Sequence, residues 1–218
     1  MVHWLERKPM SFDNTIAVID YHMGNLRSVG KAFQKIGARV VITNDPQAIK
    51  NADKIVLPGV GAFKEGMERL KQFNLIDILN REVIENKKKF LGICLGMQLI
   101  GTRSYEIEES PGLNWIKGDV VRFEGNNLKI PHVGWNEISF VRSNVLFENI
   151  PNQTDFYFVH SYHFKPDMKY IVSLTNYGFD FVSSVNQENI FGCQFHPEKS
   201  QRYGLEILKN FVNLKNDQ

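Results

Sequence analysis

Short apolar runs alternate with amphipathic stretches over residues 15–94, and this alternation constrains the fold more than any other feature of the sequence. Each run has the length of a strand and lacks a polar face, which is typical of parallel strands covered on both sides. The four runs are TIAVID (15–20), ARVVIT (38–43), KIVLPG (54–59) and FLGIC (90–94). The stretches between them, 25–37, 45–52 and 63–86, are predicted helices. The pattern predicts an α/β fold, with a mostly parallel central sheet and flanking helices.

The character of the sequence changes after Tyr105, where shorter segments read as strands joined by turns. These segments are GDVVRFE, EISFV, DFYFVHSYHF, YIVSLTNYG, FVSSVN and NIFGCQF. An amphipathic helical segment, YGLEILKNFVNL (203–214), ends the periodic part of the chain. We therefore expect additional antiparallel strands beside the parallel ones, within one α/β domain that has a mixed sheet.

The domain is expected to span residues 15–218. Residues 1–14 are polar, contain Pro9 and show no periodicity, so they are predicted to be a flexible N-terminal extension. Met10 is an alternative natural start. The rest of the chain contains neither an internal repeat nor a linker of the kind that separates domains.

Charge and hydropathy exclude several classes of protein. The chain has 26 Lys and Arg against 24 Asp and Glu, a net charge of +2, which argues against nucleic-acid binding and against an anionic membrane surface. The N-terminus lacks the apolar core of a secretion signal, and no apolar run approaches the length of a membrane span. These observations predict a soluble, cytoplasmic protein.

The chain has two cysteines, and one of them stands in a motif. Cys94 lies in GICLG (92–96), at the predicted junction of a strand and a helix. A nucleophile at such a junction sits on a sharp turn that flanking glycines permit, at the edge of the sheet where α/β folds place their sites. A buried structural thiol explains the five residues equally well. Cys193, in the apolar run IFGCQF, is predicted to belong to the core.

A thiol nucleophile needs a base and a group that orients the base, and GCQFHPEKS (192–200) contains both. His196 and Glu198 are two residues apart, so in an extended chain their side chains point the same way. Pro197 between them disfavours a helix. The other histidines are weaker candidates for the base: His132 and His160 lack a carboxylate at this spacing, His3 lies in the N-terminal extension, and His22 and His163 have no supporting pattern.

An acyl-transfer site also needs hydrogen-bond donors for an oxyanion. Pro58-Gly59-Val60-Gly61 ends a neighbouring strand, and its glycines allow backbone N–H groups to turn toward Cys94, although a simple turn explains the tetrapeptide as well. No metal is expected, because the histidines show no paired ligand spacing. No cofactor is expected either, since both common nucleotide-binding motifs are absent.

Six segments together resemble the class I, triad-type glutamine amidotransferases, and within them the glutaminase subunits of imidazole glycerol phosphate synthase. They are IDYHMGNLRSV, LPGVGAFKEGMERL, GICLGMQLI, PHVGWNEI, YFVHSYHF and GCQFHPEKS, in that order from residue 19 to residue 200. GICLGMQ and FHPEKS mark the class, while PGVGAF, PHVGWNE and YFVHSY are more particular to this subunit. The resemblance implies a flavodoxin-like fold.

The resemblance assigns roles residue by residue. Cys94 matches the nucleophile that forms a γ-glutamyl thioester, His196 the general acid and base, and Glu198 its orienting partner. Gly59, Val60 and Gly61 match the oxyanion strand, which reorients in this family when the partner binds. Leu95 matches a further backbone donor for the oxyanion, in the turn after Cys94. The residues that match contacts to substrate L-glutamine are Gly96, Gln98, Glu106, Ser161 and Tyr162. The residues that match the face toward the partner are Asn25, His132, Gly134, Trp135, Asn136 and Lys199.

The partner implied by the resemblance is a (β/α)8-barrel cyclase, into which ammonia made at Cys94 passes to complete a step of histidine biosynthesis. Trp135 is a natural anchor for that interface, although a tryptophan packed in its own core is the alternative. Gly101 and Thr102 depart from the bulkier or acidic residues usual after Gln98, and the N-terminal extension is longer than the family needs.

Three other functions remain open. A paralogous subunit that supplies ammonia for amidation of a bacterial surface sugar shares nearly all these motifs. A binding protein that has lost the chemistry is disfavoured by the intact triad, and a peptidase with the same turn is disfavoured by Gln98 and the HSY segment. The fold alone does not distinguish between these functions.

Overall fold

A computed structural model describes residues 14–125 and 128–215 of the chain. The predicted flexible extension over 1–14 therefore lies outside the described residues, except for Asn14. The side-chain amide of Asn14 donates a hydrogen bond to the carbonyl of Val212, which ties this residue to the C-terminal helix.

A nine-stranded mixed sheet forms the centre of the molecule, in the order β2-β1-β3-β4-β13-β12-β11-β8-β9. The first five strands run parallel: β1 (Thr15–Ile19), β2 (Arg39–Thr43), β3 (Lys54–Gly59), β4 (Lys89–Cys94) and β13 (Ile190–Cys193). The other four pair antiparallel: β8 (His132–Phe140), β9 (Thr154–His160), β11 (Ile171–Asn176) and β12 (Asp180–Gln187). The predicted mixed α/β fold is confirmed.

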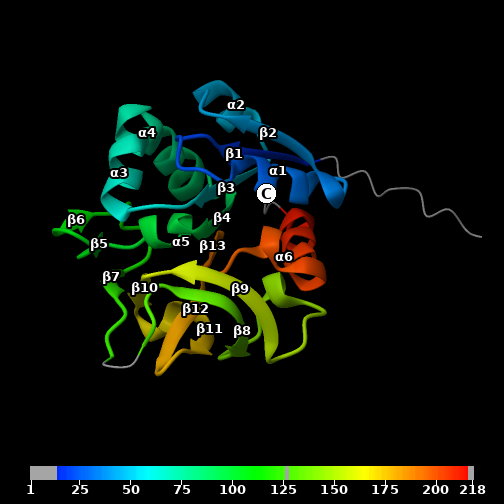
Figure 1. Ribbon diagram of the computed structural model, residues 1–218. Helices are drawn as coiled ribbons and strands as arrows, with labels where there is room; N and C mark the ends of the chain where they lie inside the picture. Colours follow the sequence, from blue (N-terminus) through cyan, green and yellow to red (C-terminus); the bar gives the residue numbers. More distant parts are fainter. Residues whose placement is uncertain (1–13, 126–127, 216–218) are drawn as a thin grey trace, which may run out of the picture.

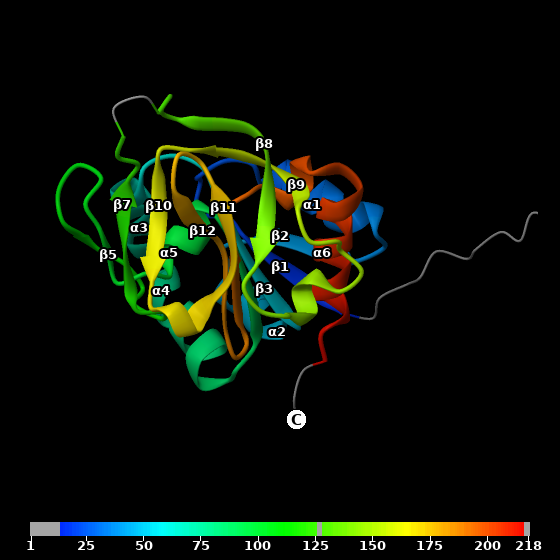
Figure 2. The same ribbon diagram turned by 90° about the horizontal axis from the view of Figure 1, so that it is seen from below.

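Helices cover both faces of the parallel half, because its strands are apolar on both sides. Helices α1 (Leu26–Lys35) and α6 (Gln201–Asn213) pack on one face. The helices on the other face are α2 (Pro46–Asn51), α3 (Phe63–Gln72), α4 (Leu75–Leu79) and α5 (Leu95–Leu99). Figure 1 shows β8, β9, β11 and β12 below the parallel strands, and Figure 2 shows α1 and α6 on the opposite side from α3, α4 and α5.

The helical span predicted over 63–86 is broken in the structure. Helix α3 ends at Gln72, and Asn74 adopts a left-handed conformation with φ of 54°. Asparagine tolerates this conformation better than most residues, which is why the chain turns here. After α4 the backbone continues as a π-helix, Asn80–Glu85. No helix within 14–125 or 128–215 has both the length and the apolar character needed to cross a bilayer.

The predicted strand DFYFVHSYHF (155–164) is two strands that belong to different sheets. Strand β9 ends at His160, and β10 (Tyr162–Pro166) joins a small second sheet in the order β10-β7-β5-β6. The other strands of this sheet are β5 (Arg103–Ser104), β6 (Ser110–Pro111) and β7 (Gly118–Arg122). The break at Ser161 leaves this residue and its neighbours at the edge of the main sheet, beside the carboxyl end of β4.

Strand β13 determines where the site forms. It lies parallel to β4, with Cys193 opposite Ile93, so the residues that follow each strand leave the sheet side by side. On the other side of β4, the end of β3 places Gly59 opposite Cys94. Residues that are far apart in sequence, near 60, 94 and 196, are therefore neighbours at one edge of the sheet.

Candidate active site

Cys94 sits on a sharp turn between β4 and α5. Its φ of 53° and ψ of −106° lie outside the common regions for a non-glycine residue, which costs about 1–3 kcal/mol of backbone strain. The flanking glycines make the turn possible: a Cβ on Gly96 would lie 1.7 Å from the carbonyl oxygen of Leu57, and one on Gly92 would lie 2.6 Å from that of Gly96. Only glycine fits at these two positions.

The sulfur of Cys94 lies at the wall of a pocket of about 500 Å³, a volume sufficient for an amino acid. The pocket is lined by Val60, Gly61, Cys94, Leu95, Gln98, Glu106, Pro131, Val159, His160, Ser161, Tyr162 and Lys199. The Sγ atom is 4.0 Å from the carbonyl oxygen of Val159 and 3.6 Å from the side-chain nitrogen of Gln194. Most of the residues predicted to contact substrate therefore share one cavity with Cys94.

His196 and Glu198 form a buried pair beside Cys94. The Nδ1 atom of His196 is 2.8 Å from Oε1 of Glu198, and both side chains are almost completely inaccessible to solvent. The backbone between them differs from the expected extended form, because Pro197 begins a one-turn 3-10 helix, Pro197–Lys199. Proline suits the first position of a helix, where no N–H is required. The pair still forms, since Nδ1 and the carboxylate lie on the same side of this turn.

The charge state of His196 depends on Cys94. Burial lowers the pKa of this imidazole, but a negative sulfur on Cys94 and the carboxylate of Glu198 outweigh burial and raise the pKa to about 10. Because Nδ1 faces Glu198, Nε2 is the nitrogen available for proton transfer. Nε2 is buried, and within the described part of the chain it has no hydrogen-bond partner. The site therefore favours the protonated form of His196.

Asn25 is part of this arrangement rather than of the pocket wall. It precedes α1 with φ of 62°, and its side-chain amide donates a hydrogen bond to Oε1 of Glu198. The same oxygen faces His196. Asn25 thus fixes the carboxylate that orients the imidazole.

The glycine-rich segment after β3 does not present all its amides to the pocket. Val60 and Gly61 line the cavity, and Gly61 has φ of 108°. The backbone N–H of Val60, however, donates to the carbonyl oxygen of Met23 at 2.9 Å. In this conformation the Val60 amide cannot serve an oxyanion at Cys94.

Two of the predicted substrate contacts are held by internal hydrogen bonds. Gln98 donates from Nε2 to the carbonyl of Tyr162 at 2.9 Å and to Oε1 of Gln194 at 3.0 Å. Glu106 accepts the backbone N–H of Phe63 at the start of α3, and its carbonyl accepts the hydroxyl of Tyr162 at 2.8 Å. These bonds fix the walls of the pocket, while their roles toward glutamine stay predictions.

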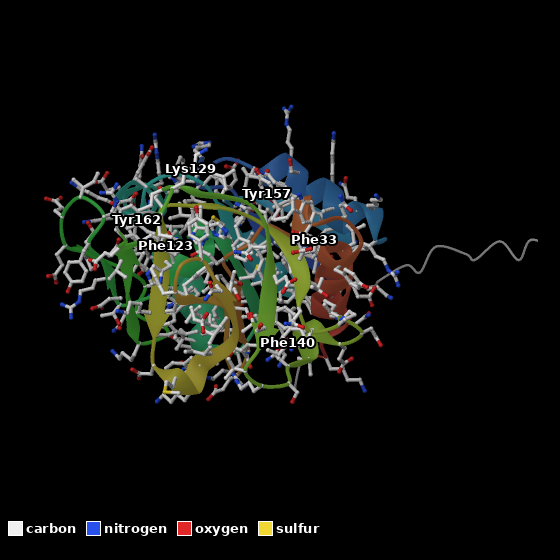
Figure 3. The ribbon with its side chains drawn as sticks, turned by 60° about the horizontal axis from the view of Figure 1, so that its bottom comes forward. Phe33, Phe123, Lys129, Phe140, Tyr157 and Tyr162 are labelled. Atoms are coloured by element: carbon white, nitrogen blue, oxygen red, sulfur yellow. The ribbon has the colours of Figure 1, made fainter. Side chains whose placement is uncertain are left out.

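The residues predicted to face the partner divide into exposed and buried groups. Trp135 is 47% exposed, with its ring 6.0 Å from that of Tyr157, so the alternative of a tryptophan in its own core is wrong. The ammonium group of Lys199 lies 5.6 Å from the centre of the Tyr157 ring. Gly134 lies between Val133 and Trp135 in β8. Tyr157, a residue of β9, is labelled in Figure 3. The exposed side chains form an apolar and basic surface beside the pocket.

His132, by contrast, is only 3% exposed. Its Nδ1 is 3.1 Å from Nε2 of His160, and its Nε2 is 3.3 Å from the amide of Asn136. A direct contact between His132 and a partner is not available in this conformation. Its predicted place on the partner face stays untested, and any influence would pass through Asn136 or His160.

Three buried histidines surround Phe123, which is labelled in Figure 3. Burial lowers the pKa of His132 to about 4, that of His160 to about 3 and that of His163 to about 4. These imidazoles are neutral in the native state at neutral pH. They lower the free energy of unfolding on acidification, because the unfolded chain binds protons at these histidines near pH 6.5 and the native chain does not.

We expect the free energy of unfolding to fall between pH 6.5 and pH 5.0. Each of the three histidines contributes a slope of up to about 1.4 kcal/mol per pH unit, so the loss amounts to a few kcal/mol. His196 offsets little of this, because its raised pKa keeps it protonated in the native chain and the unfolded chain is already partly protonated there. Urea unfolding at the two pH values measures the loss. The variant His163→Leu should reduce it by about a third, and equal stability at both pH values would contradict the assignment of neutral histidines.

Within residues 14–125 and 128–215 no group of three His, Cys, Asp or Glu side chains is arranged to hold a metal ion. Two residues near Cys94 escaped the sequence analysis. Gln194 lies in the segment GCQFHPEKS, two residues before His196, but its contacts are with Cys94 and Gln98, about 100 residues away in sequence, so no local pattern indicates them. Met23 acts through its carbonyl oxygen, and no side-chain pattern reveals such a role.

Comparison with known proteins agrees with this geometry. The glutamine amidotransferase class-I family model matches residues 17–214. The imidazole glycerol phosphate synthase subunit HisH 1 of Campylobacter jejuni (strain RM1221) is 50% identical over 200 residues, covering 91% of this chain and 100% of the relative. The subunit HisH of Geobacter metallireducens is 48% identical over 205 residues, covering 91% of this chain and 97% of the relative.

Solved structures show the same fold at low identity. PurLQS from Thermotoga maritima matches with a TM-score of 0.71 and 16% identity, over 92% of this chain and 98% of that chain. A glutamine amidotransferase from the same organism matches with a TM-score of 0.60 and 20% identity, over 87% of this chain and 78% of that chain. The chain therefore belongs to the class I glutamine amidotransferases and is an enzyme of that class. Within it, the chain belongs to the HisH family of imidazole glycerol phosphate synthase subunits.

Proposed function

We propose that this chain hydrolyses L-glutamine to glutamate and ammonia with Cys94, His196 and Glu198, and delivers the ammonia to a cyclase subunit in histidine biosynthesis. The observation that carries this proposal is the meeting of the three side chains beside one pocket. Family membership supplies the substrate, and the geometry supplies a nucleophile, a proton carrier and an orienting carboxylate.

Acylation begins with attack of the Cys94 thiolate on the γ-carboxamide carbon of glutamine. The C–S bond forms while the carbonyl π electrons move onto oxygen. Collapse of this intermediate breaks the C–N bond, and Nε2 of His196 gives its proton to the departing nitrogen, which leaves as ammonia. Glu198 holds the ring so that Nε2 faces the reaction.

Deacylation regenerates the thiolate. Water attacks the thioester, Nε2 of the now neutral His196 accepts its proton, and the C–S bond breaks to release glutamate. The sum of both steps is glutamine plus water giving glutamate plus ammonia. The oxyanion formed in each step requires backbone donors, for which Leu95 and the segment Gly59 to Gly61 are the candidates.

The partner we propose is a (β/α)8-barrel cyclase that binds over the surface formed by Trp135, Val133 and Lys199. Two of these side chains are exposed apolar groups, 47% and 55% accessible, and the third is a cation next to the pocket. Exposed aromatic and aliphatic side chains are typical of the centre of a protein interface, and a cation such as Lys199 suits its polar rim. Lys199 and Pro131 border the pocket, so ammonia released there has a short path to a partner on this face.

The surface-sugar reading keeps the same chemistry and changes only the acceptor. The relatives from Campylobacter, Geobacter and Vibrio vulnificus are all named as imidazole glycerol phosphate synthase subunits, which favours the histidine pathway. A binding protein without catalysis is disfavoured because Cys94, His196 and Glu198 are in place.

The test is reconstitution with a purified imidazole glycerol phosphate cyclase barrel from the same organism. With the barrel's nucleotide substrate present, glutamine should replace added ammonium salt as the nitrogen source for imidazole glycerol phosphate. A barrel that works with ammonium salt but gains nothing from this chain and glutamine would contradict the histidine-pathway assignment and favour the surface-sugar acceptor.

A further inference from the structure

Behind Cys94 lies a buried chain of amide groups. Gln98 Nε2 donates to the Tyr162 carbonyl at 2.9 Å and to Gln194 Oε1 at 3.0 Å, and Gln194 Nε2 is 3.6 Å from Cys94 Sγ. The side chain of Gln194 is completely buried, and that of Gln98 nearly so. These hydrogen bonds therefore connect the Tyr162 carbonyl to the reacting sulfur of Cys94 through side chains that are buried from solvent.

The Tyr162 carbonyl determines which atom donates and which accepts in each of these hydrogen bonds. A carbonyl oxygen only accepts, so the atom of Gln98 that faces it must be the nitrogen. The second N–H on that nitrogen then points at Gln194, which must present its oxygen. The nitrogen of Gln194 is left to face Cys94. Turning either amide around would bring two acceptors or two donors together in a buried site, which costs more than the bond is worth.

The Tyr162 carbonyl is itself held from a second side. Nδ1 of His160 lies 2.8 Å from the same oxygen, so Nδ1 carries the proton and Nε2 accepts from Nδ1 of His132. The amide of Asn136 donates to the remaining nitrogen of His132. His160, which His132 holds in turn, thus anchors the oxygen that orients Gln98 and Gln194.

We propose that Gln194 is a further catalytic residue, whose side-chain N–H donates to Cys94 Sγ and stabilises its thiolate form. This inference rests on the proposed function of Cys94 as nucleophile. An N–H donor binds a negatively charged sulfur more strongly than a neutral thiol or a thioester. Gln194 therefore favours the thiolate before attack and again when the C–S bond breaks in deacylation.

Other titratable side chains near the Cys94 sulfur could also affect its reactivity. The titratable side chains coupled to Cys94 are His196, Tyr21 and Cys193. Burial raises the pKa of Tyr21 and of Cys193, so both are neutral near pH 7. His196 is the remaining titratable group beside this sulfur, and none of the variants below alters it.

The first variant is Gln194→Met, which keeps the size of the side chain and removes the donor. The second is Gln194→Glu, which keeps an acceptor for Gln98 and replaces the donor with a carboxylate. We expect the rate of Cys94 alkylation by iodoacetamide at pH 7 to fall about 10- to 100-fold, and the pH midpoint of alkylation to move upward. We expect kcat for glutamine to fall with it. The control Gln34→Met, on the exposed face of α1, should change neither.

Folded Gln194 variants with the parent's alkylation profile would overturn this inference, while an active Cys94→Ala would overturn the proposed function instead. A readout on the unaltered chain covers variants that fail to fold. The side-chain ¹⁵N–¹H resonances of Gln194 should shift with pH, with the same midpoint as the pH dependence of the Cys94 alkylation rate. This shift should be absent in Cys94→Ala. A pH-dependent shift that persists in Cys94→Ala, or no shift in the parent, would equally contradict the proposal.

Discussion

Replacing Cys94 with alanine is expected to abolish glutamine hydrolysis, by more than about 10⁴-fold in kcat, because no thioester can form without the sulfur. His196 retains its bond to Glu198 in this variant, so the loss reflects the nucleophile alone. The fold should survive, since the side chain is small and the turn is fixed by Gly92 and Gly96. The measurement is glutamate release in the presence of the activating partner.

The matched control is Cys193→Ala. This second cysteine is also buried, with its sulfur 3.9 Å from the Gly92 carbonyl, but it points into the core and lines no pocket wall near Cys94. Its loss should lower the melting temperature by a few degrees and leave hydrolysis intact. Glutaminase activity that persists in Cys94→Ala and vanishes in Cys193→Ala would reverse the roles of the two thiols.

Cys94→Ser separates chemistry from packing. A serine hydroxyl fills the same space but is far less acidic than a thiol, so His196 and Gln194 cannot produce a nucleophile from it at neutral pH. We expect this variant to bind the partner as the parent does, which surface plasmon resonance can verify. Inactivity together with unchanged partner binding excludes misfolding as the cause.

The part of the fold that follows from local pattern could be predicted from the sequence. The apolar runs ending at Gly59 and Cys94 specify parallel strands, because only strands covered on both faces lack a polar side. The glycines around Cys94 specify its turn, since a Cβ at either position meets backbone atoms. These features depend on neighbours in the chain, and the sequence contains those neighbours.

The features that escaped prediction depend on residues distant in sequence. Ser161 divides two strands because β9 pairs with β8, whereas β10 pairs with β7 in another sheet, and an apolar run gives no sign of which partner each half selects. The role of Gln194 emerges only where β13 lies beside β4. The triad itself was accessible because His196 and Glu198 are two residues apart.

The hydrogen bond between Val60 and Met23 predicts that the free chain is a slow enzyme. In the present conformation the Val60 N–H is occupied by the Met23 carbonyl, so the oxyanion at Cys94 lacks one donor. The loss of a single oxyanion donor costs about 10²–10³-fold in kcat. We therefore expect the cyclase barrel with its nucleotide ligand to raise kcat by about that factor, with a smaller change in KM.

The increase in kcat should be accompanied by a structural change at one peptide. Hydrogen exchange of the Val60 amide should be slow in the free chain, where Met23 holds it, and faster in the complex, where the peptide turns toward the pocket. The Gly66 amide, which donates to Ala62 at the start of α3, is a control that should not change. A free chain that matches the complex in kcat would contradict the occupied donor as the cause of low activity. Stimulation without a change at Val60 would instead point to the Leu95 side of the oxyanion site.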